Sequence, residues 1–120
     1  MGDLVVGVGL RDGVAAEAVL EAIGDIVDDP ADLRALATLD RKATESAVAT
    51  AAAELGVAVL GFTADELAAV PVPNPSGRVA AEVGTPSVAE AAAVLGSGGG
   101  DLLVRKRARD GVTVALARTV

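Results

Sequence analysis

The sequence contains no cysteine, histidine, tryptophan or tyrosine, and Phe62 is its only aromatic residue. Without cysteine there are no disulfides and no thiolate chemistry, and without histidine the usual general base and the commonest metal ligand are missing. Catalysis by a serine–histidine or cysteine–histidine pair is therefore excluded within this chain. The carboxylates show no metal-ligand spacing either, so we predict no metal site and no bound cofactor.

Positive charge is also scarce, because the chain of 120 residues carries a formal net charge of −7. Nucleic-acid readers usually combine a basic surface with stacking aromatic rings, so we set nucleic acid aside as a partner. No apolar run is long enough to cross a membrane, and Met1-Gly2-Asp3 lacks the positive charge that starts a secretory signal. We expect a cytoplasmic protein that does not bind membranes.

The length predicts one domain over residues 1–120, with a core of Val, Leu, Ile and Ala. The apolar run Leu4–Val8 predicts a strand buried on both faces, and residues 14–27 combine apolar positions at helical spacing with an acidic stripe. The alternation continues with a helical turn at Asp29-Pro30, a strand over 35–39, a helix over 44–55 and a strand over 57–60. Such alternation favours parallel strands joined by crossover helices.

The second half of the chain predicts short helices and a hairpin. Thr63 and Glu66 form a capping box before a helix over 64–69, and Ser87 and Glu90 form a second one before a helix to about Leu95. Further expected elements are a proline-rich loop over 71–77, a helix over 75–82 and two strands, 102–104 and 112–116, that flank an Asp110-Gly111 turn signal. We predict a single three-layer α/β/α domain whose mixed, mostly parallel sheet of about five strands ends in an antiparallel hairpin.

Glycines follow the first predicted strand, in the pattern G-x-G-x-x-x-G from Gly7 to Gly13. This spacing departs from the dinucleotide-binding G-x-G-x-x-G by one residue. A helix start presented by glycines favours an anion, to which Arg11 adds charge. An anion site and a simple tight turn both remain open at this stage.

Two other segments lie where α/β sheets bind ligands. Lys42 and Glu45 follow the second strand, at whose carboxyl end a crevice is expected, although a helix-dipole role for Glu45 and a solvated Lys42 explain them equally well. Asn74 and Ser76 offer hydrogen-bonding side chains at another helix start, with Arg78 one turn inside. Ordinary helix capping by Asn74 is the alternative.

A basic cluster near the end of the chain stands out in an acidic protein. It comprises Arg105, Lys106, Arg107 and Arg109, and strand alternation places Arg105 and Arg107 together, opposite Lys106. The cluster can attract a polyanion locally. Alternatively, the charges protect the edge of the hairpin from pairing with another chain.

Taken in order, these segments resemble the CobE/CbiG C-terminal family of cobalamin (vitamin B12) biosynthesis proteins. The resemblance covers nearly the whole chain and looks like the short CobE form. The motifs that carry it are Gly7-Val8-Gly9 with Arg11 and Gly13, Thr38-Leu39-Asp40 with Lys42 and Glu45, Pro73-Asn74-Pro75-Ser76, Gly84 to Ala92 with its Ser-Val-Ala-Glu core, and Lys106 followed by Val112 to Ala115.

The resemblance implies work on a corrin-ring intermediate at the ring-contraction stage, where larger family members open the δ-lactone of cobalt-precorrin-5A and release acetaldehyde. On that mechanism Glu45 is the base and Lys42 its electrostatic partner. The implied substrate-binding residues are Gly9, Arg11, Gly13, Thr38, Asp40, Asn74, Ser76, Ser87 and Lys106. The alternatives are a non-catalytic carrier of the intermediate and an accessory subunit of a precorrin methyltransferase, and other cobalamin-pathway enzymes are possible partners.

Overall fold

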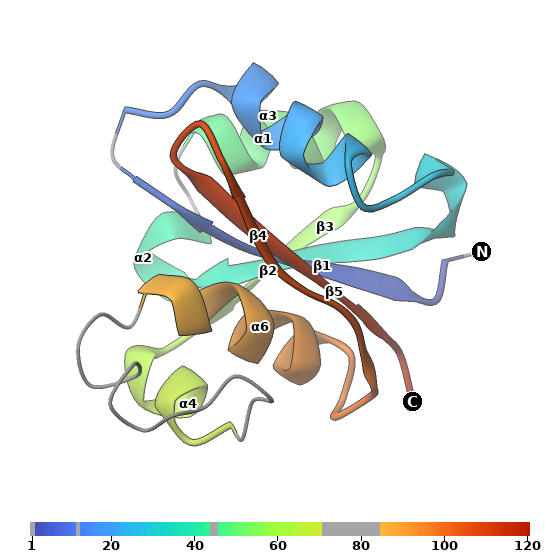
Figure 1. Ribbon diagram of the computed structural model, residues 1–120, viewed down its shortest axis with the longest axis vertical. Helices are drawn as coiled ribbons and strands as arrows, with labels where there is room; N and C mark the ends of the chain where they lie inside the picture. The colour runs from blue at the N-terminus through green and yellow to red at the C-terminus, as the bar shows by residue number, and fades with distance from the viewer. Residues whose placement is uncertain (1, 12, 44–45, 71–84) are drawn as a thin grey trace.

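A mixed sheet of five strands, in the order β3-β2-β1-β5-β4, forms the middle layer of the molecule (Figure 1). The computed structural model describes residues 2–11, 13–43, 46–70 and 85–120. The strands β1, β2 and β3 are parallel, whereas β5 pairs antiparallel with both β1 and β4. Their bounds are β1 Leu4–Leu10, β2 Leu33–Leu39, β3 Ala58–Phe62, β4 Leu102–Arg109 and β5 Val112–Arg118. The predicted mixed sheet with a closing hairpin is confirmed.

Helices cover both faces of this sheet (Figure 1). One face carries α1 (Ala16–Gly24) and α3 (Ser46–Leu55), and the other carries α6 (Thr85–Gly96) and α4 (Ala64–Ala68). A one-turn helix, α2, follows β2 directly over Asp40–Ala43. The three-layer α/β/α arrangement predicted from the alternation of elements is thus the one observed.

The face under α1 and α3 is filled by branched aliphatic side chains. Side chains of β1, β2 and β5 alternate toward this face and pack against the apolar stripes of the two helices. This is the larger of the buried clusters, and its fully buried members include Val6, Val8, Val19, Leu36, Val48 and Val114.

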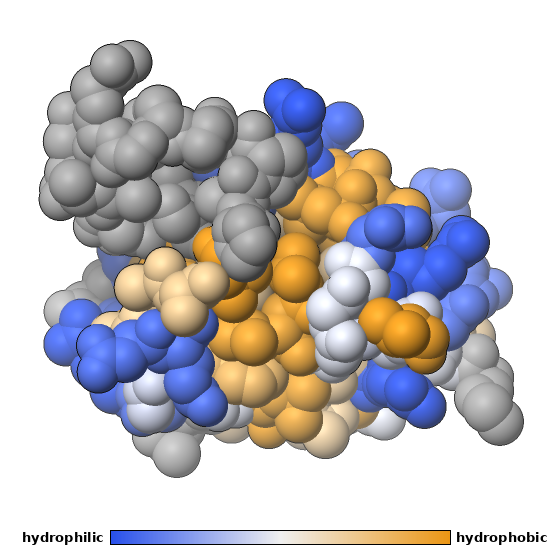
Figure 2. Space-filling view, turned by 90° about the horizontal axis from the view of Figure 1, so that it is seen from below, coloured by the Kyte–Doolittle hydropathy of each residue, from blue (hydrophilic) through white to orange (hydrophobic). Residues whose placement is uncertain are grey.

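The face under α6 and α4 is built mostly from small residues instead. Its buried members are Val5, Leu67 of α4 and a set of alanines, namely Ala37, Ala89, Ala91, Ala92, Ala93, Ala115 and Ala117. Helix α6 lies so close to β1 that a Cβ added at Gly7 would stand 1.8 Å from the Ala89 carbonyl oxygen and 2.6 Å from the Ala93 nitrogen. Gly7 therefore permits backbone-to-backbone packing that no other residue allows. Figure 2, which views the molecule from below, shows a broad area of apolar residues with hydrophilic residues on its flanks.

The edge strand β4 is irregular. Its pairing with β5 changes register between Leu102 and Val104 and again between Val104 and Arg107. Three steps along β4 match only two along β5 in the second interval, so residues 105–106 form a β-bulge. Beyond it the turn signal behaves as predicted, because Asp110 and Gly111 both have positive φ, 51° and 84°, as a two-residue hairpin turn requires.

The local predictions at helix starts have mixed outcomes. Thr63 and Glu66 form the predicted capping box, with the Thr63 N–H donating to Glu66 Oε1 at 2.8 Å and the Glu66 N–H to Thr63 Oγ1 at 3.1 Å. The second predicted capping box is wrong, because α6 begins at Thr85, so Ser87 lies inside the helix rather than at its cap. The Asp29 side chain accepts from the Ala31 N–H at 2.9 Å, which confirms the predicted turn before β2.

Glycines of the predicted loop belong to the strand. Strand β1 runs through Gly7 and Gly9 to Leu10, so the interpretation of Gly7 to Gly13 as one glycine loop is wrong. Pairing along the whole length of β1 with β5 holds both glycines in the sheet. The predicted proline loop over 71–77 and the helix over 75–82 lie outside the described residues.

Candidate functional site

The parallel strands β1, β2 and β3 all end at one edge of the sheet, called here the carboxyl edge. Helix α6 also begins toward this edge, because its residue Ala89 lies over Gly7 while its last residue, Gly96, lies over Val5 at the start of β1. After β2 the chain leads to α3 on one face, whereas after the neighbouring strand β3 it leads to α4 on the other face (Figure 1). Ligands of open α/β sheets bind where neighbouring connections diverge in this way.

Predicted binding residues gather along this edge. Arg11 follows β1 and is exposed, and its N–H donates to the Gly111 carbonyl of the hairpin turn at 3.0 Å. Gly13, at φ 85°, lies in the short connection to α1. Asp40 opens α2 at the end of β2 and is exposed, and Lys42 is half-buried in the same turn. Four of the predicted site residues therefore lie along the carboxyl edge, namely Arg11, Gly13, Asp40 and Lys42.

Strands β1 and β2 separate before they reach the edge. Their backbone pairing ends at Gly7 and Ala37, although β1 continues to Leu10 and β2 to Leu39. The buried Thr38 hydroxyl bridges the gap by donating to the Val8 carbonyl oxygen at 2.7 Å. Thr38 was predicted to bind substrate. Its hydroxyl hydrogen is instead donated to β1, which places Thr38 to hold the two strands together.

Other predicted residues are placed differently or not at all. Gly9 lies in β1 opposite Thr113 of β5, inside the sheet. The predicted base Glu45 and the predicted ligand contacts Asn74 and Ser76 lie outside the described residues. The backbone of Ser87 lies in the first turn of α6, at the end of the helix nearest the carboxyl edge.

Lys106 lies on β4, at the bulge. Its backbone N–H donates to Glu90 Oε2 of α6 at 3.0 Å. Glu90 is fully buried, and its second oxygen, Oε1, has no hydrogen-bond partner in the described part of the chain. Sequence reasoning assigned Glu90 to a helix cap and so missed it. The signal that could have revealed Glu90 is a lone carboxyl in a run of alanines, where an ionisable group is costly without partners.

Arg109, the last member of the predicted basic cluster, is engaged within the molecule. Its guanidinium donates to both Asp25 carboxylate oxygens of α1, at 2.9 and 3.1 Å, and lies 3.9 Å from Glu21. The hydrogen bond to Asp25, with the carboxylate charges around it, raises the pKa of Arg109. Arg109 therefore connects the hairpin to α1, and its charge is paired within the molecule. Arg105 and Arg107 are exposed.

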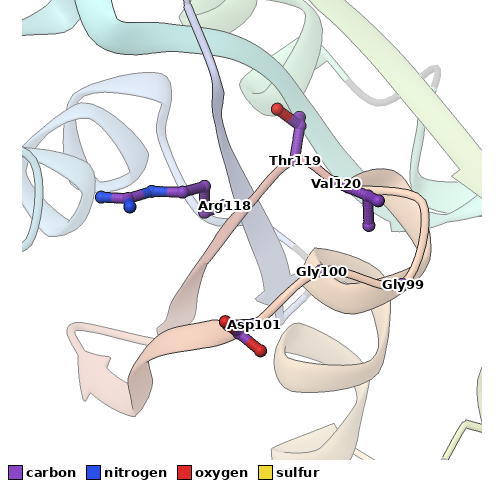
Figure 3. A pocket seen from close by; sticks show the side chains of 6 residues that line it. All are labelled: Gly99, Gly100, Asp101, Arg118, Thr119 and Val120. Carbon is purple, nitrogen blue, oxygen red and sulfur yellow. The ribbon is translucent and has the colours of Figure 1, made fainter.

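A hollow of about 270 Å³ lies at the opposite edge of the sheet (Figure 3). It is lined by the connection after α6 and the end of β5, with Gly99, Gly100, Asp101, Arg118, Thr119 and Val120. The Arg118 and Asp101 side chains point in different directions, so they do not converge on one position (Figure 3). The Arg118 backbone N–H donates to the Asp101 carbonyl oxygen at 3.0 Å, so backbone atoms of these two residues form part of the wall of the hollow. None of the predicted site residues that the structure describes lines this hollow.

Within residues 2–11, 13–43, 46–70 and 85–120, no helix is long and apolar enough to cross a membrane. Within the same ranges, no group of three or more acidic residues is arranged to hold a metal ion. The chemistry of the carboxyl edge, as far as the chain is described, therefore comes from Arg11, Asp40, Arg41 and Lys42.

Comparison with known proteins gives one consistent result. The family model for the cobalamin synthesis G C-terminus matches residues 4–117. Protein CobE of Sinorhizobium sp is 37% identical over 121 residues, which cover 95% of this chain and 79% of that protein. The crystal structure of a CobE from the cobalamin (vitamin B12) biosynthetic pathway has a TM-score of 0.78 at 34% identity, over 98% of this chain and 90% of that chain. That of cobalamin biosynthesis protein chiG from Agrobacterium tumefaciens str. C58 has a TM-score of 0.74 at 32% identity, over 97% and 98%.

Proposed function

The chain belongs to the cobalamin synthesis G C-terminus family, as its motifs predicted, and on this premise we propose that it binds a corrin-ring intermediate at the carboxyl edge. It is a cobalamin biosynthesis protein of the short, CobE-like form. The stage proposed for it is ring contraction, which the resemblance implies.

The observation that supports a ligand at the carboxyl edge is the placement of cations there. Arg11 follows β1, and Arg41 and Lys42 lie in α2 directly after β2. Arg11 and Arg41 are exposed, in a protein whose net charge is −7. Corrin-ring intermediates carry several side-chain carboxylates, and cations spaced along one edge can bind such a ligand at several points. Local positive charge is needed because the protein as a whole repels polyanions.

Opening of a lactone is the catalytic form of this proposal. The reaction needs a base that activates water and positive charge that stabilises the developing oxyanion. Lys42 is half-buried at the end of β2, where it can supply the charge, and Glu45, three residues further, is the proposed base. With no histidine or cysteine in the chain, a carboxylate is the base that this edge offers.

The test mixes the purified protein with the lactone-bearing precorrin-5 intermediate, with and without cobalt, and follows acetaldehyde release and the corrinoid spectrum. We expect a spectral shift on binding, weakened about tenfold by Lys42→Ala, which removes one charge-assisted contact. Arg34→Ala is the matched control, because Arg34 is an exposed cation at the opposite end of β2.

The outcomes separate the functional classes. Acetaldehyde release that Glu45→Gln abolishes makes the protein a lactone hydrolase. A spectral shift without acetaldehyde makes it a carrier of the intermediate. No shift and no product with either form of the intermediate contradicts direct binding and leaves an accessory role beside a pathway enzyme.

A further inference from the structure

The bulge in β4 and the buried carboxyl of Glu90 meet at a single point. A β-bulge leaves one backbone N–H without a partner in the ladder, and here Lys106 lies in the bulge. Its N–H donates instead to Glu90 Oε2 at 3.0 Å, across from the second turn of α6. Glu90 therefore holds the irregular part of the edge strand against α6.

The same bulge decides which way Lys106 faces. Arg107 pairs with Val114, whose side chain belongs to the core under α1 and α3, so Arg107 lies on that face. Alternation then places Lys106 on the opposite face, with α6. Burial agrees, because Lys106 is half-buried while Arg105 and Arg107 are exposed. Lys106 thus lies on the α6 face, whereas its neighbour Arg107 lies on the face of α1 and α3.

The backbone contact alone does not explain why residue 90 carries a carboxyl group. One backbone N–H needs one acceptor, yet Glu90 has two oxygens, and the fully buried Oε1 has no hydrogen-bond partner among the residues that the structure describes. A buried polar atom without a partner costs stability, so a carboxyl retained in this position calls for a further reason. Among the residues that the structure describes, the Lys106 ammonium has no carboxylate within salt-bridge distance. The Lys106 backbone is thus fixed by Glu90, and the half-buried Lys106 side chain can pair with the anion of a ligand.

We propose that Glu90 is a positioning residue: it clasps the Lys106 backbone so that the Lys106 ammonium binds a side-chain carboxylate of the corrin-ring intermediate on the α6 side of the sheet. This inference rests on the proposed function. Lys106 lies level with the Gly7 region of β1, about three residues, or roughly 10 Å, from the end of that strand. A macrocycle with extended carboxylate side chains can span from the carboxyl edge to this position.

The experiment measures the affinity of the full chain for cobyrinic acid, a stable polycarboxylate corrinoid, by its visible spectrum. The variants are Glu90→Met, which removes the acceptor at similar side-chain size, Glu90→Gln, which keeps an acceptor oxygen, Lys106→Ala, the combination of Glu90→Met with Lys106→Ala, and Arg105→Ala as an exposed control from the same strand. We expect about a tenfold loss for Glu90→Met and for Lys106→Ala, no additional loss when the two are combined, and near wild-type affinity for Glu90→Gln. The same corrinoid with esterified carboxylates should bind wild type and Lys106→Ala equally.

Two further readouts separate positioning from a merely structural role. The thermal midpoint of Glu90→Gln, which keeps the acceptor, should equal or exceed that of wild type, because a buried carboxyl without a full set of partners is lost. Without ligand, the Lys106 amide should exchange with solvent faster in Glu90→Met than in wild type or Glu90→Gln.

The failures are distinguishable. Wild-type affinity in Glu90→Met, or independent losses that multiply in the double variant, overturns this inference and leaves the proposed function standing. A wild-type protein that binds neither cobyrinic acid nor the precorrin-5 intermediates overturns the proposed function and this inference with it.

Discussion

The two faces of the sheet are packed by different means. Under α1 and α3, branched side chains such as Val19 and Leu36 fill the space between helix and sheet. Under α6 the space itself is nearly absent, because Gly7 and a layer of alanines bring the backbones together. The first face gains its stability from buried apolar area, and the second gains a fixed helix position. Lys106 of β4, which we propose binds the ligand, and Glu90 of α6, which positions it, both belong to the second face.

This difference explains how a buried carboxyl is held accurately. A helix that rests on side chains can shift when one of them changes, whereas α6 rests on the backbone of β1 at Gly7. The position of Glu90 relative to the β4 bulge is set by that contact. Functional sites need such accurate support, and the small-residue face supplies it.

The largest expected effect comes from adding one methyl group to the α6 face. Gly7→Ala places a Cβ 1.8 Å from the Ala89 carbonyl oxygen, so α6 must move off the sheet. We expect a loss of about 3 kcal/mol in the free energy of unfolding, measured by urea denaturation. Gly24→Ala is the matched control, because an added Cβ there meets nothing within 4 Å. Equal stability of the two variants would show that the two faces do not differ as described.

A smaller effect is expected from removing a methyl group on the other face. Ile23 is 3% exposed and packs in the core under α1 and α3. Ile23→Val should cost about 1 kcal/mol, the usual result of a small cavity that neighbours partly fill. Urea denaturation measures this loss, and corrinoid affinity should stay at the wild-type level. A large loss of affinity would mean that this face also positions the site.

The smallest effect is expected at the surface contact between α1 and the hairpin. Arg109→Ala removes the contacts to Asp25 and Glu21, which are exposed pairs screened by water and salt. We expect a small drop in the thermal midpoint that shrinks as the salt concentration rises. Arg107→Ala, which removes an exposed cation nearby, is the control. A drop that is independent of salt would point to packing of the Arg109 stem instead.

Patterns that depend on neighbouring residues were predicted correctly from the sequence. Thr63 and Glu66 bond to each other three residues apart, and the Asp110-Gly111 turn needs only its own backbone angles. The strand and helix alternation likewise gave the three layers, and it brought Arg11 and Lys42 to one edge of the sheet.

Features that depend on distant residues were not predicted. Gly7 was predicted both within the first strand and as the first glycine of a loop pattern, but its contact with α6, far along the chain, was not predicted. The sequence around Glu90 fits a capping box as well as the sequence around Glu66 does. The two glutamates differ in the structure, where Glu66 accepts from the Thr63 N–H and Glu90 accepts from the distant Lys106 N–H. Local pattern is the same in both pairs, so the sequence near Glu90 could not decide between a cap and a site. The prediction that Glu45 is a base remains untested.

The contact between Gly7 and Ala89 also has a consequence for the order of folding. It joins the first strand to a helix near the end of the chain, so the polypeptide between them must close into a large loop before the contact forms. The units β1-α1-β2 and β2-α3-β3 can pair earlier from nearby segments. We infer that docking of α6 is a late event in folding, and that Glu90 reaches Lys106 only when the rest of the sheet is in place.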